Sequence, residues 1–248
     1  MISYWNGDKP KESIMLRIEH LTKKYGEKKA VDDLSLHIEK GEIYGFIGHN
    51  GAGKTTTIKS VVGILDFDEG EIYIDGKSVK KESLECKREI AYIPDNPDLY
   101  EFMTGIQYLT FISDIFGVGE KERKERIEKY AEAFGIKDDL SSVISSYSHG
   151  MKQKLAVISA LVHDPKLIIM DEPFVGLDPI ASHLLKEIMR EKCNEGGAIF
   201  FSTHVLEVAE KLCDKIAIIK GGKLIKSGTM EEVKGDSSLE SVFLELEE

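Results

Sequence analysis

The chain has 248 residues, of which 42% are hydrophobic and 31% are charged, and this balance is ordinary for a globular protein. A formal net charge of −11 argues against a nucleic-acid binder held by bulk charge and against direct adhesion to anionic lipid, so no nucleic-acid partner is expected. The longest apolar run, residues 155–162, falls well short of the about 20 residues that a membrane-spanning helix needs.

Residues 1–14 are expected to be a flexible extension, and residues 15–248 a single domain. The extension is polar and lacks the apolar core of a secretory signal peptide. Well-patterned sequence begins near Met15, and the length fits one large domain or a domain with a subdomain. The three cysteines are odd in number and show no C-x-x-C spacing, so they are expected to be reduced thiols of a cytoplasmic protein.

The first hundred residues have the pattern of short strands separated by turns. Alternating or continuous apolar residues predict strands at 16–19, 34–38, 42–47, 71–74 and 90–93. Polar and glycine-containing stretches predict turns at 25–27, 66–70 and 75–76. One predicted helix, over residues 56–65, interrupts this series.

A glycine-rich loop lies between the strand at 42–47 and the helix at 56–65, and it fits G-x-x-x-x-G-K-[ST], the Walker A phosphate loop. Its residues are Gly48, His49, Asn50, Gly51, Ala52, Gly53, Lys54 and Thr55. Glycines let the backbone curl so that successive N–H groups face the phosphates of a nucleoside triphosphate. Lys54 would contact the β- and γ-phosphates, Thr55 would bind Mg²⁺, and Thr56 would open a helix whose N-terminus attracts phosphate. Strand, loop and helix in this order predict nucleotide binding.

Helical patterns dominate from about residue 98 to residue 165, which we expect to be a subdomain inserted in the core. The clearest helix spans 120–134, where apolar residues recur at i, i+3, i+4 and i+7. Strands are predicted next at 167–170, 198–202 and 215–219, and helices at 180–193 and 205–213. This alternation predicts an α/β fold with a mostly parallel sheet covered on both faces. A last helical pattern, over 239–246, is expected to dock on the domain's own core.

Two acids follow the apolar strand at 167–170, and they form a second candidate for nucleotide chemistry. Asp171 and Glu172 fit the end of a Walker B strand, where open α/β sheets bind their ligands. Asp171 would hold Mg²⁺, and Glu172 would orient and polarise the attacking water as a general base. Because many buried strands end in an acid, this interpretation depends on Lys54 upstream.

With these motifs in place, residues 16–246 resemble the ATP-binding subunit of an ATP-binding cassette (ABC) transporter. The resemblance implies a P-loop NTPase core with a mostly parallel sheet, an N-terminal antiparallel β subdomain and the inserted helical subdomain. It also implies that the cofactors are ATP and Mg²⁺. The activity implied is ATP hydrolysis coupled to transport.

Four further elements occur in the family's order: Tyr25, Tyr147-Ser148-His149-Gly150-Met151, Gly176-Leu177-Asp178-Pro179 and His204. The resemblance implies that Tyr25 stacks on adenine and that His204 is the switch histidine at the γ-phosphate. Residues 147–151 resemble the signature loop, which precedes a helix predicted over 152–162. Residues 176–179 resemble the D-loop, which places Asp178 among the nucleotide-site residues.

The family's mechanism implies two subunits that meet head to tail around two ATP molecules. Ser148 and the backbone N–H of Gly150 would then donate hydrogen bonds to the γ-phosphate held by the other subunit. Hydrolysis would remove the acceptor of these bonds and weaken the dimer. The resulting opening and closing would move an attached membrane partner.

This sequence departs from the family's pattern in two places. Asp95 stands where the family often has glutamine, and its shorter, charged side chain is expected to reach Mg²⁺ only through water. His149 and Met151 replace a glycine and the glutamine of the signature loop, while Ser148 and Gly150 are retained. His149 is expected to face solvent, and the alternative is that its side chain reaches a phosphate.

The resemblance also implies the partners and the location. The partners are a separate transmembrane permease subunit and a second ATP-binding subunit, in a homodimer or a heterodimer. The subunit would sit peripherally on the inner, cytoplasmic face of the cell membrane. Residues 95–100 and the tail at 239–246 resemble the branch of the family that drives export.

The alternative is a soluble ABC-type ATPase that remodels a cytosolic complex. DNA-repair relatives need a long coiled coil between Lys54 and Asp171, which these residues do not encode, and translation relatives carry two cassettes. A role in cluster assembly stays open. A module that binds ATP without hydrolysing it is disfavoured, because Glu172 and His204 are both present.

Overall fold

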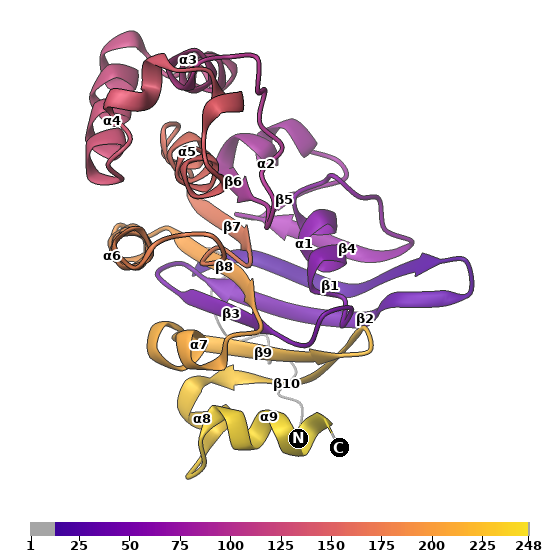
Figure 1. Cartoon of the computed structure of the whole chain (residues 1–248). Coiled ribbons are helices and arrows are strands. Elements are labelled where there is room, and N and C mark those ends of the chain that lie inside the picture. Colours follow the sequence, from indigo (N-terminus) through magenta and orange to yellow (C-terminus); the bar gives the residue numbers. More distant parts are fainter. Residues whose placement is uncertain (1–12, 248) are drawn as a thin grey trace.

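The computed structural model describes residues 13–247 (Figure 1). The predicted N-terminal extension, residues 1–14, therefore lies outside the described residues except for its last two. Those two belong to the fold: Ser13 O accepts a hydrogen bond from Lys40 N at 2.8 Å, and Ile14 is buried at the start of the first strand. The predicted boundary at Met15 is thus slightly late, because Ile14 already pairs with Glu39 of the next strand.

The N-terminal part of the chain forms an antiparallel sheet with the strand order β2-β1-β4-β5. Its strands are β1 (Ile14–Tyr25), β2 (Lys28–Glu39), β4 (Glu69–Ile74) and β5 (Lys77–Ser78). The predicted strands at 16–19 and 34–38 are therefore too short. Both strands continue into lysine-rich ends, which pair with each other as an exposed β-hairpin. Bulges near His20 and Asp33 interrupt the apolar alternation between the predicted segments and these ends.

A six-stranded sheet carries the nucleotide motifs, in the order β10-β9-β3-β8-β7-β6. Its strands are β3 (Ile43–Ile47), β6 (Ile90–Ile93), β7 (Leu167–Asp171), β8 (Ala198–Thr203), β9 (Lys215–Lys220) and β10 (Lys223–Thr229). All neighbours pair in parallel except β10, which is antiparallel to β9. This sheet confirms the predicted α/β fold. Sequence analysis missed β10, because this edge strand is only partly buried and has no apolar run.

Helices cover the six-stranded sheet and connect its strands. They are α1 (Lys54–Val61), α2 (Ser83–Glu89), α3 (Gly105–Ile115), α4 (Glu120–Ala133), α5 (His149–Leu161), α6 (Pro179–Asn194), α7 (Leu206–Leu212), α8 (Met230–Lys234) and α9 (Leu239–Glu247). Short 3₁₀ turns lie at Asp138–Ser141 and Ile144–Ser146. Within residues 13–247, every helix is too short or too polar to cross a bilayer.

Two predicted helices have wrong boundaries, and each difference has a local cause. α1 begins at Lys54 instead of 56, because the left-handed Gly53 is its N-cap, and it ends near the left-handed Gly63 instead of at 65. α5 begins at His149 instead of 152. Ser148 Oγ accepts a hydrogen bond from Met151 N and so caps the helix earlier than its apolar pattern suggests.

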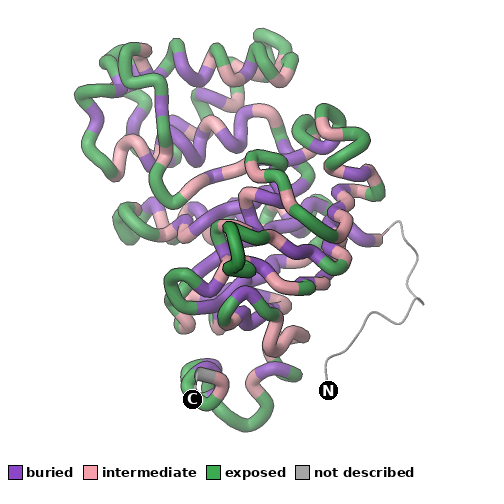
Figure 2. Tube along the Cα trace, turned by 90° about the vertical axis from the view of Figure 1, so that its right-hand side faces the viewer, coloured by how far each residue is buried: buried purple, intermediate pink, exposed green. Residues whose placement is uncertain are grey.

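Both faces of the six-stranded sheet are buried at β3 and β6 to β9, which explains why these strands have continuous apolar runs, whereas the edge strand β10 is only partly buried. Successive side chains point to opposite faces. Phe46 and Phe200 pack against the antiparallel sheet and α1, whereas Ile47 and Phe201 pack against the layer that contains α3 to α9. Figure 2 shows the buried segments concentrated in the middle of the trace.

The two ends of the molecule are helical (Figure 1). α3 and α4 pack on α5 at one end, where Leu109 and Ile127 are buried. α8 and α9 lie at the other end, and α9 buries Leu239, Val242 and Phe243. The prediction that the C-terminal helix docks on its own core is confirmed.

Candidate nucleotide-binding site

The phosphate loop connects β3 to α1 and is held tightly against the neighbouring backbone. Gly51 and Gly53 have left-handed φ angles of 83° and 114°. A Cβ atom at Gly53 would lie 2.5 Å from Ala30 O, and one at Gly48 would lie 2.5 Å from Ile219 O. Only glycine fits such positions without displacing the backbone. The sequence thus folds into the curled loop that the motif requires.

Lys54 is buried and points back into the loop. Its Nζ donates hydrogen bonds to Gly48 O at 2.6 Å and to His49 O at 3.3 Å. The same nitrogen lies 3.6 Å from Glu172 Oε1. Since only 6% of the Lys54 side chain is exposed, this charge is held in place and can pair with an anion in the loop.

Thr55 and Asp171 meet across two elements that are far apart in the sequence. Thr55 Oγ1 donates to Asp171 Oδ2 at 2.6 Å, and Ser202 Oγ donates to Asp171 Oδ1. β8, which carries Ser202, lies between β3 and β7. The paired hydroxyl and carboxylate are hard oxygen donors, and they fit Mg²⁺, which proteins bind through one or two side-chain oxygens plus substrate phosphates.

Glu172 follows Asp171 with a left-handed backbone, φ 49°, which is costly for a residue other than glycine. Its N–H is shared between Ser202 O at 3.2 Å and Ser202 Oγ at 3.1 Å. The side chain is 15% exposed, and its Oε1 lies 2.9 Å from His204 Nδ1. The strained turn therefore aims Glu172 between Lys54 and His204 instead of letting it continue the strand.

Asp95 is exposed, and within residues 13–247 no hydrogen bond or ion pair joins its side chain to the Thr55–Asp171 pair. Its Oδ1 accepts a hydrogen bond from Asn96 N at 2.9 Å, so the side chain closes its own turn. Its backbone carbonyl accepts a hydrogen bond from Gln153 Nε2 of α5 at 2.8 Å. The loop after β6 is thereby tied to the helix that carries the signature residues.

The signature and D-loop residues cap two helices at the surface. Ser148 is exposed and is the N-cap of α5, with Gly150 in its first turn. Asp178 is the N-cap of α6, where its Oδ1 accepts a hydrogen bond from Ala181 N at 2.8 Å. Its hydrogen bond and ion pair with Lys154 hold the pKa of the Asp178 carboxyl below its ordinary value. His149 is exposed, as expected.

Three further predicted residues lie in separate places: Tyr25 at the end of β1, Asn50 in the phosphate loop and Thr56 in the first turn of α1. Tyr25 stands at the tip of the β1–β2 hairpin with 53% of its surface exposed, and Lys23 Nζ lies 5.5 Å from its ring centroid. Asn50 is exposed, and Thr56 O accepts a hydrogen bond from Ser60 Oγ. Among residues 13–247, no hydrogen bond or ion pair joins these three residues to the Lys54–Glu172 cluster.

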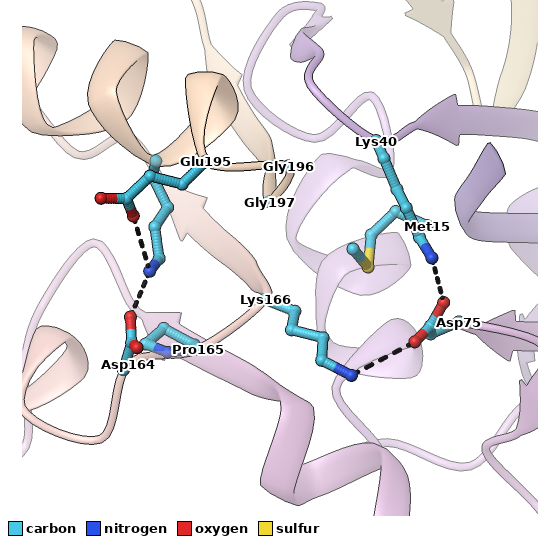
Figure 3. Close-up of a pocket in the computed structure, with 10 residues that line it drawn as sticks. Met15, Lys40, Asp75, Asp164, Pro165, Lys166, Glu195, Gly196 and Gly197 are labelled. Carbon is cyan, nitrogen blue, oxygen red and sulfur yellow. Dashed lines mark hydrogen bonds and ion pairs between the residues drawn. The ribbon is translucent and has the colours of Figure 1, made fainter.

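A cavity of about 470 Å³ at the opposite edge of the sheet is not the nucleotide site (Figure 3). It lies beside Lys166 and Gly197, which precede β7 and β8, whereas ligands of open α/β sheets bind at the carboxyl ends of the strands. Its three lysines are already paired with carboxylates: Lys40 with Asp75 at 2.8 Å, Lys166 with Asp75 at 3.4 Å and with Glu89 at 2.9 Å, and Lys192 with Asp164 and with Glu195 at 3.4 Å. The cavity therefore offers no unbalanced charge for a phosphate.

A family profile described as ABC transporter matches residues 31–175, which is more than half of the chain. The chain belongs to the ABC transporter family. It is an ATP-binding subunit of that family and an ATPase, as the resemblance of its motifs implied.

Individual ABC proteins are similar over most of the chain. The ABC transporter ATP-binding protein NatA of Bacillus subtilis is 35% identical over 224 residues, which are 88% of this chain and 91% of NatA. The linearmycin resistance ATP-binding protein LnrL of the same organism is 35% identical over 219 residues, which are 88% of this chain and 70% of LnrL. A solved ATP-binding subunit of an ABC transporter is 35% identical with a TM-score of 0.91, covering 94% of this chain and 100% of that chain. These likenesses confirm the predicted P-loop ATPase fold.

Two residues that join parts of the candidate nucleotide site were not predicted from the sequence. Ser202 bridges Asp171 and the Glu172 backbone, and its signal was a hydroxyl at the end of an otherwise apolar strand. Gln153 is buried and joins α5 to the loop at Asp95, and its signal was a polar residue on the apolar face of a helix. Neither role could be assigned without knowing which strands and helices are neighbours.

Proposed function

We propose that this ABC subunit hydrolyses MgATP at a site shared by two ATP-binding subunits and thereby drives a separate membrane permease that exports its cargo. The observation that carries the proposal is the convergence of Lys54, the Thr55–Asp171 pair and the Glu172–His204 pair at the carboxyl ends of β3, β7 and β8. These are the groups that phosphoryl transfer needs: a cation, a metal-binding oxygen pair and a base.

Each group has a distinct role in this proposal. The N–H groups of residues 48–56 and Lys54 Nζ bind the phosphates, with Tyr25 against the adenine. Thr55 and Asp171 would hold Mg²⁺, which neutralises phosphate charge when bound, and Asp95 would approach it through water. Glu172 Oε1 is buried 2.9 Å from His204 Nδ1 and 3.6 Å from Lys54 Nζ, and the carboxylate would accept a proton from the attacking water. His204 orients Glu172 and contacts the γ-phosphate.

A second subunit is part of the proposal because the signature residues are not joined to the phosphate loop of their own chain. Ser148, Gly150 and Asp178 belong to α5 and α6, and within residues 13–247 no hydrogen bond or ion pair joins them to the phosphate loop. Ser148 is exposed at the start of a helix, where N–H groups favour an anion. A second ATP-binding subunit, the same or related, would bring its own phosphate loop to this surface.

The permease partner is supported by an exposed aromatic cluster near α3. Phe102 is 79% exposed, Tyr100 is 48% exposed, and their rings stack with centroids 6.0 Å apart. Phe111 contacts Tyr100 edge-on with centroids 5.7 Å apart, and Ile115 on the same helix is 61% exposed. Aromatic groups of this kind mark protein interfaces. Bound there to a permease, the subunit would sit peripherally on the inner face of the membrane.

Export is supported by two observations on related sequences. Residues 95–100 and the α9 tail resemble export-type members of the family, and LnrL, which is similar over most of this chain, is named for resistance to linearmycin. Resistance to a toxic compound is a common result of its export.

Trapping the ATP-bound complex tests the proposal. The Glu172→Gln variant should retain MgATP and co-purify from mild detergent extracts with a polytopic membrane protein. Phe102→Asp in the same background should lose that protein and still bind ATP. Capture of soluble proteins alone, unaffected by Phe102→Asp, would instead support the cytosolic remodelling ATPase.

The direction of transport needs a separate readout. Cells that carry Lys54→Ala on the chromosome should retain more of the permease's cargo if the complex exports. Reduced uptake of an external solute in those cells would contradict export and leave the ATPase assignment intact.

A further inference from the structure

The C-terminal helix α9 contacts the phosphate loop directly. The ring centroid of Phe243 lies 4.9 Å from that of His49, and the two planes are inclined by 62°. Phe243 is only 7% exposed, whereas His49 is exposed at the loop surface. An aromatic edge-to-face contact of this kind stabilises the relative position of the two rings.

The position of Phe243 is fixed by the packing of α9. Leu239 and Val242 are buried on the same helix, and α9 packs against α7 and α8. The end of α9 is tied to the sheet as well, because Lys220 Nζ at the end of β9 donates to Leu246 O at 2.9 Å. α9 therefore presents Phe243 as part of the folded core.

His49 belongs to the part of the loop that curls around the phosphates. Its carbonyl accepts hydrogen bonds from Ala52 N at 3.1 Å and from Lys54 Nζ at 3.3 Å. A second connection runs from the turn after β9, where Gly222 N donates to Ala52 O at 2.8 Å. Thus α9 reaches the loop along two routes, through the His49 ring and through Lys220 and the turn that follows it.

We propose that α9 positions the phosphate loop and that Phe243 and His49 are positioning residues that set the affinity for ATP. The inference rests on the proposed role of residues 48–56 as the phosphate loop, and it goes beyond that role by assigning the loop's conformation to the C-terminal helix. A loop held in the binding conformation loses less entropy when ATP binds. Neither side chain needs to touch the nucleotide for this effect.

The test measures ATP affinity and steady-state kinetics of Phe243→Leu, His49→Ala and the double variant. Phe243→Leu keeps an apolar side chain on α9 and removes the ring, so Kd and KM for ATP should rise about two- to tenfold, with a smaller change in kcat. His49→Ala, at an exposed position, should have a similar effect. Because both changes remove the same contact, the double variant should be no worse than either single variant.

Three control variants separate positioning from general damage to the helix or the loop. Phe243→Tyr keeps the ring and should bind ATP as the parent does. Leu244→Ala changes a 60% exposed residue of α9 and should also have no effect. Lys54→Ala is measured in parallel, since parental affinity in that variant would overturn the phosphate-loop assignment itself.

Two results would overturn the positioning role while leaving the phosphate-loop assignment intact. One is parental ATP affinity in both Phe243→Leu and His49→Ala alongside lost affinity in Lys54→Ala. The other is full additivity in the double variant, which would show that the two residues act independently.

Discussion

The two halves of the proposed nucleotide site are built in different ways. On the phosphate-loop side, Lys54 is 6% exposed and Glu172 is 15% exposed, and both have partners from other elements of the same chain. On the signature side, Ser148 is exposed and the Asp178 side chain is 47% exposed, and each caps its own helix. The phosphate-loop side is thus completed by contacts within one folded chain, whereas the signature residues are exposed on the surface.

This difference predicts how substitutions should act. A change on the phosphate-loop side should alter ATP binding or chemistry through contacts within one chain. A change on the signature side should leave the isolated subunit's ATP binding intact and act only when two subunits meet.

The largest expected effect is on turnover in Glu172→Gln. The amide keeps the shape of the side chain but cannot take a proton, so kcat should fall about 100- to 10,000-fold. ATP binding should persist, as measured by nucleotide retention. Glu187→Gln, at an exposed site of α6, is the matched control and should retain parental kcat. Parental turnover in Glu172→Gln would show that another group is the base.

Lys54→Ala should weaken ATP binding by about 10- to 100-fold, because it removes a charged hydrogen-bond donor from the loop. Calorimetric titration of the isolated subunit measures this directly. Lys59→Ala, on α1 beyond the loop, serves as the control. An unchanged Kd for Lys54→Ala would show that ATP binds elsewhere, and it would contradict the assignment of ATP binding to the phosphate-loop side.

Ser202→Ala should lower the free energy of unfolding by about 1 to 3 kcal/mol, because it removes a donor to buried Asp171 and an acceptor for Glu172 N. Thermal or urea unfolding measures this change. Ser113→Ala is a matched control, since that buried hydroxyl donates to Leu109 O within its own helix. Equal losses in the two variants would mean that the Ser202 bridge adds nothing.

The smallest expected effect is a pH dependence at the far end of the signature helix. His163 stacks on Phe116, and its Nε2 lies 3.0 Å from Ile90 O. Burial holds the pKa of His163 below its ordinary value of 6.5. As pH falls below 6.5, the unfolded chain gains a proton that the folded chain resists, so stability declines until the folded-state pKa is passed.

Unfolding at pH 7.5 and at pH 5.5 tests this contribution. His163→Leu should show a smaller loss of stability between these pH values than the parent does. His183→Gln, at a mostly exposed position, should keep the parental difference. An identical pH dependence in His163→Leu and the parent would exclude His163 as the source.

Local sequence was sufficient to predict the elements that have a clear apolar or glycine pattern. The buried strands at β3, β6, β7 and β8 and the phosphate loop were predicted to within about two residues, because burial on both faces and fixed glycines leave clear patterns. β10, α2 and α8 were missed because they are short or partly exposed and lack an apolar run.

In the candidate site, too, some features could be predicted from local sequence and others could not. The types of group at Lys54, Asp171 and Glu172 could be read from motifs, but the Ser202 bridge depends on β8 lying between β3 and β7. Strand order is a property of long-range pairing that periodicity does not encode. The hydrogen bond that the Asp95 carboxylate accepts from Asn96 N could not be predicted from the sequence either, because it depends on the backbone conformation after β6.

The most direct test of a site split between two subunits is sedimentation of two variants in MgATP. Glu172→Gln should form an ATP-bound dimer, and Glu172→Gln combined with Ser148→Arg should remain monomeric while binding ATP with the same Kd. That pair of results would establish that Ser148 acts on nucleotide held by the other subunit. A dimer that persists with Ser148→Arg, or an ATP affinity lost from the monomer, would contradict the account.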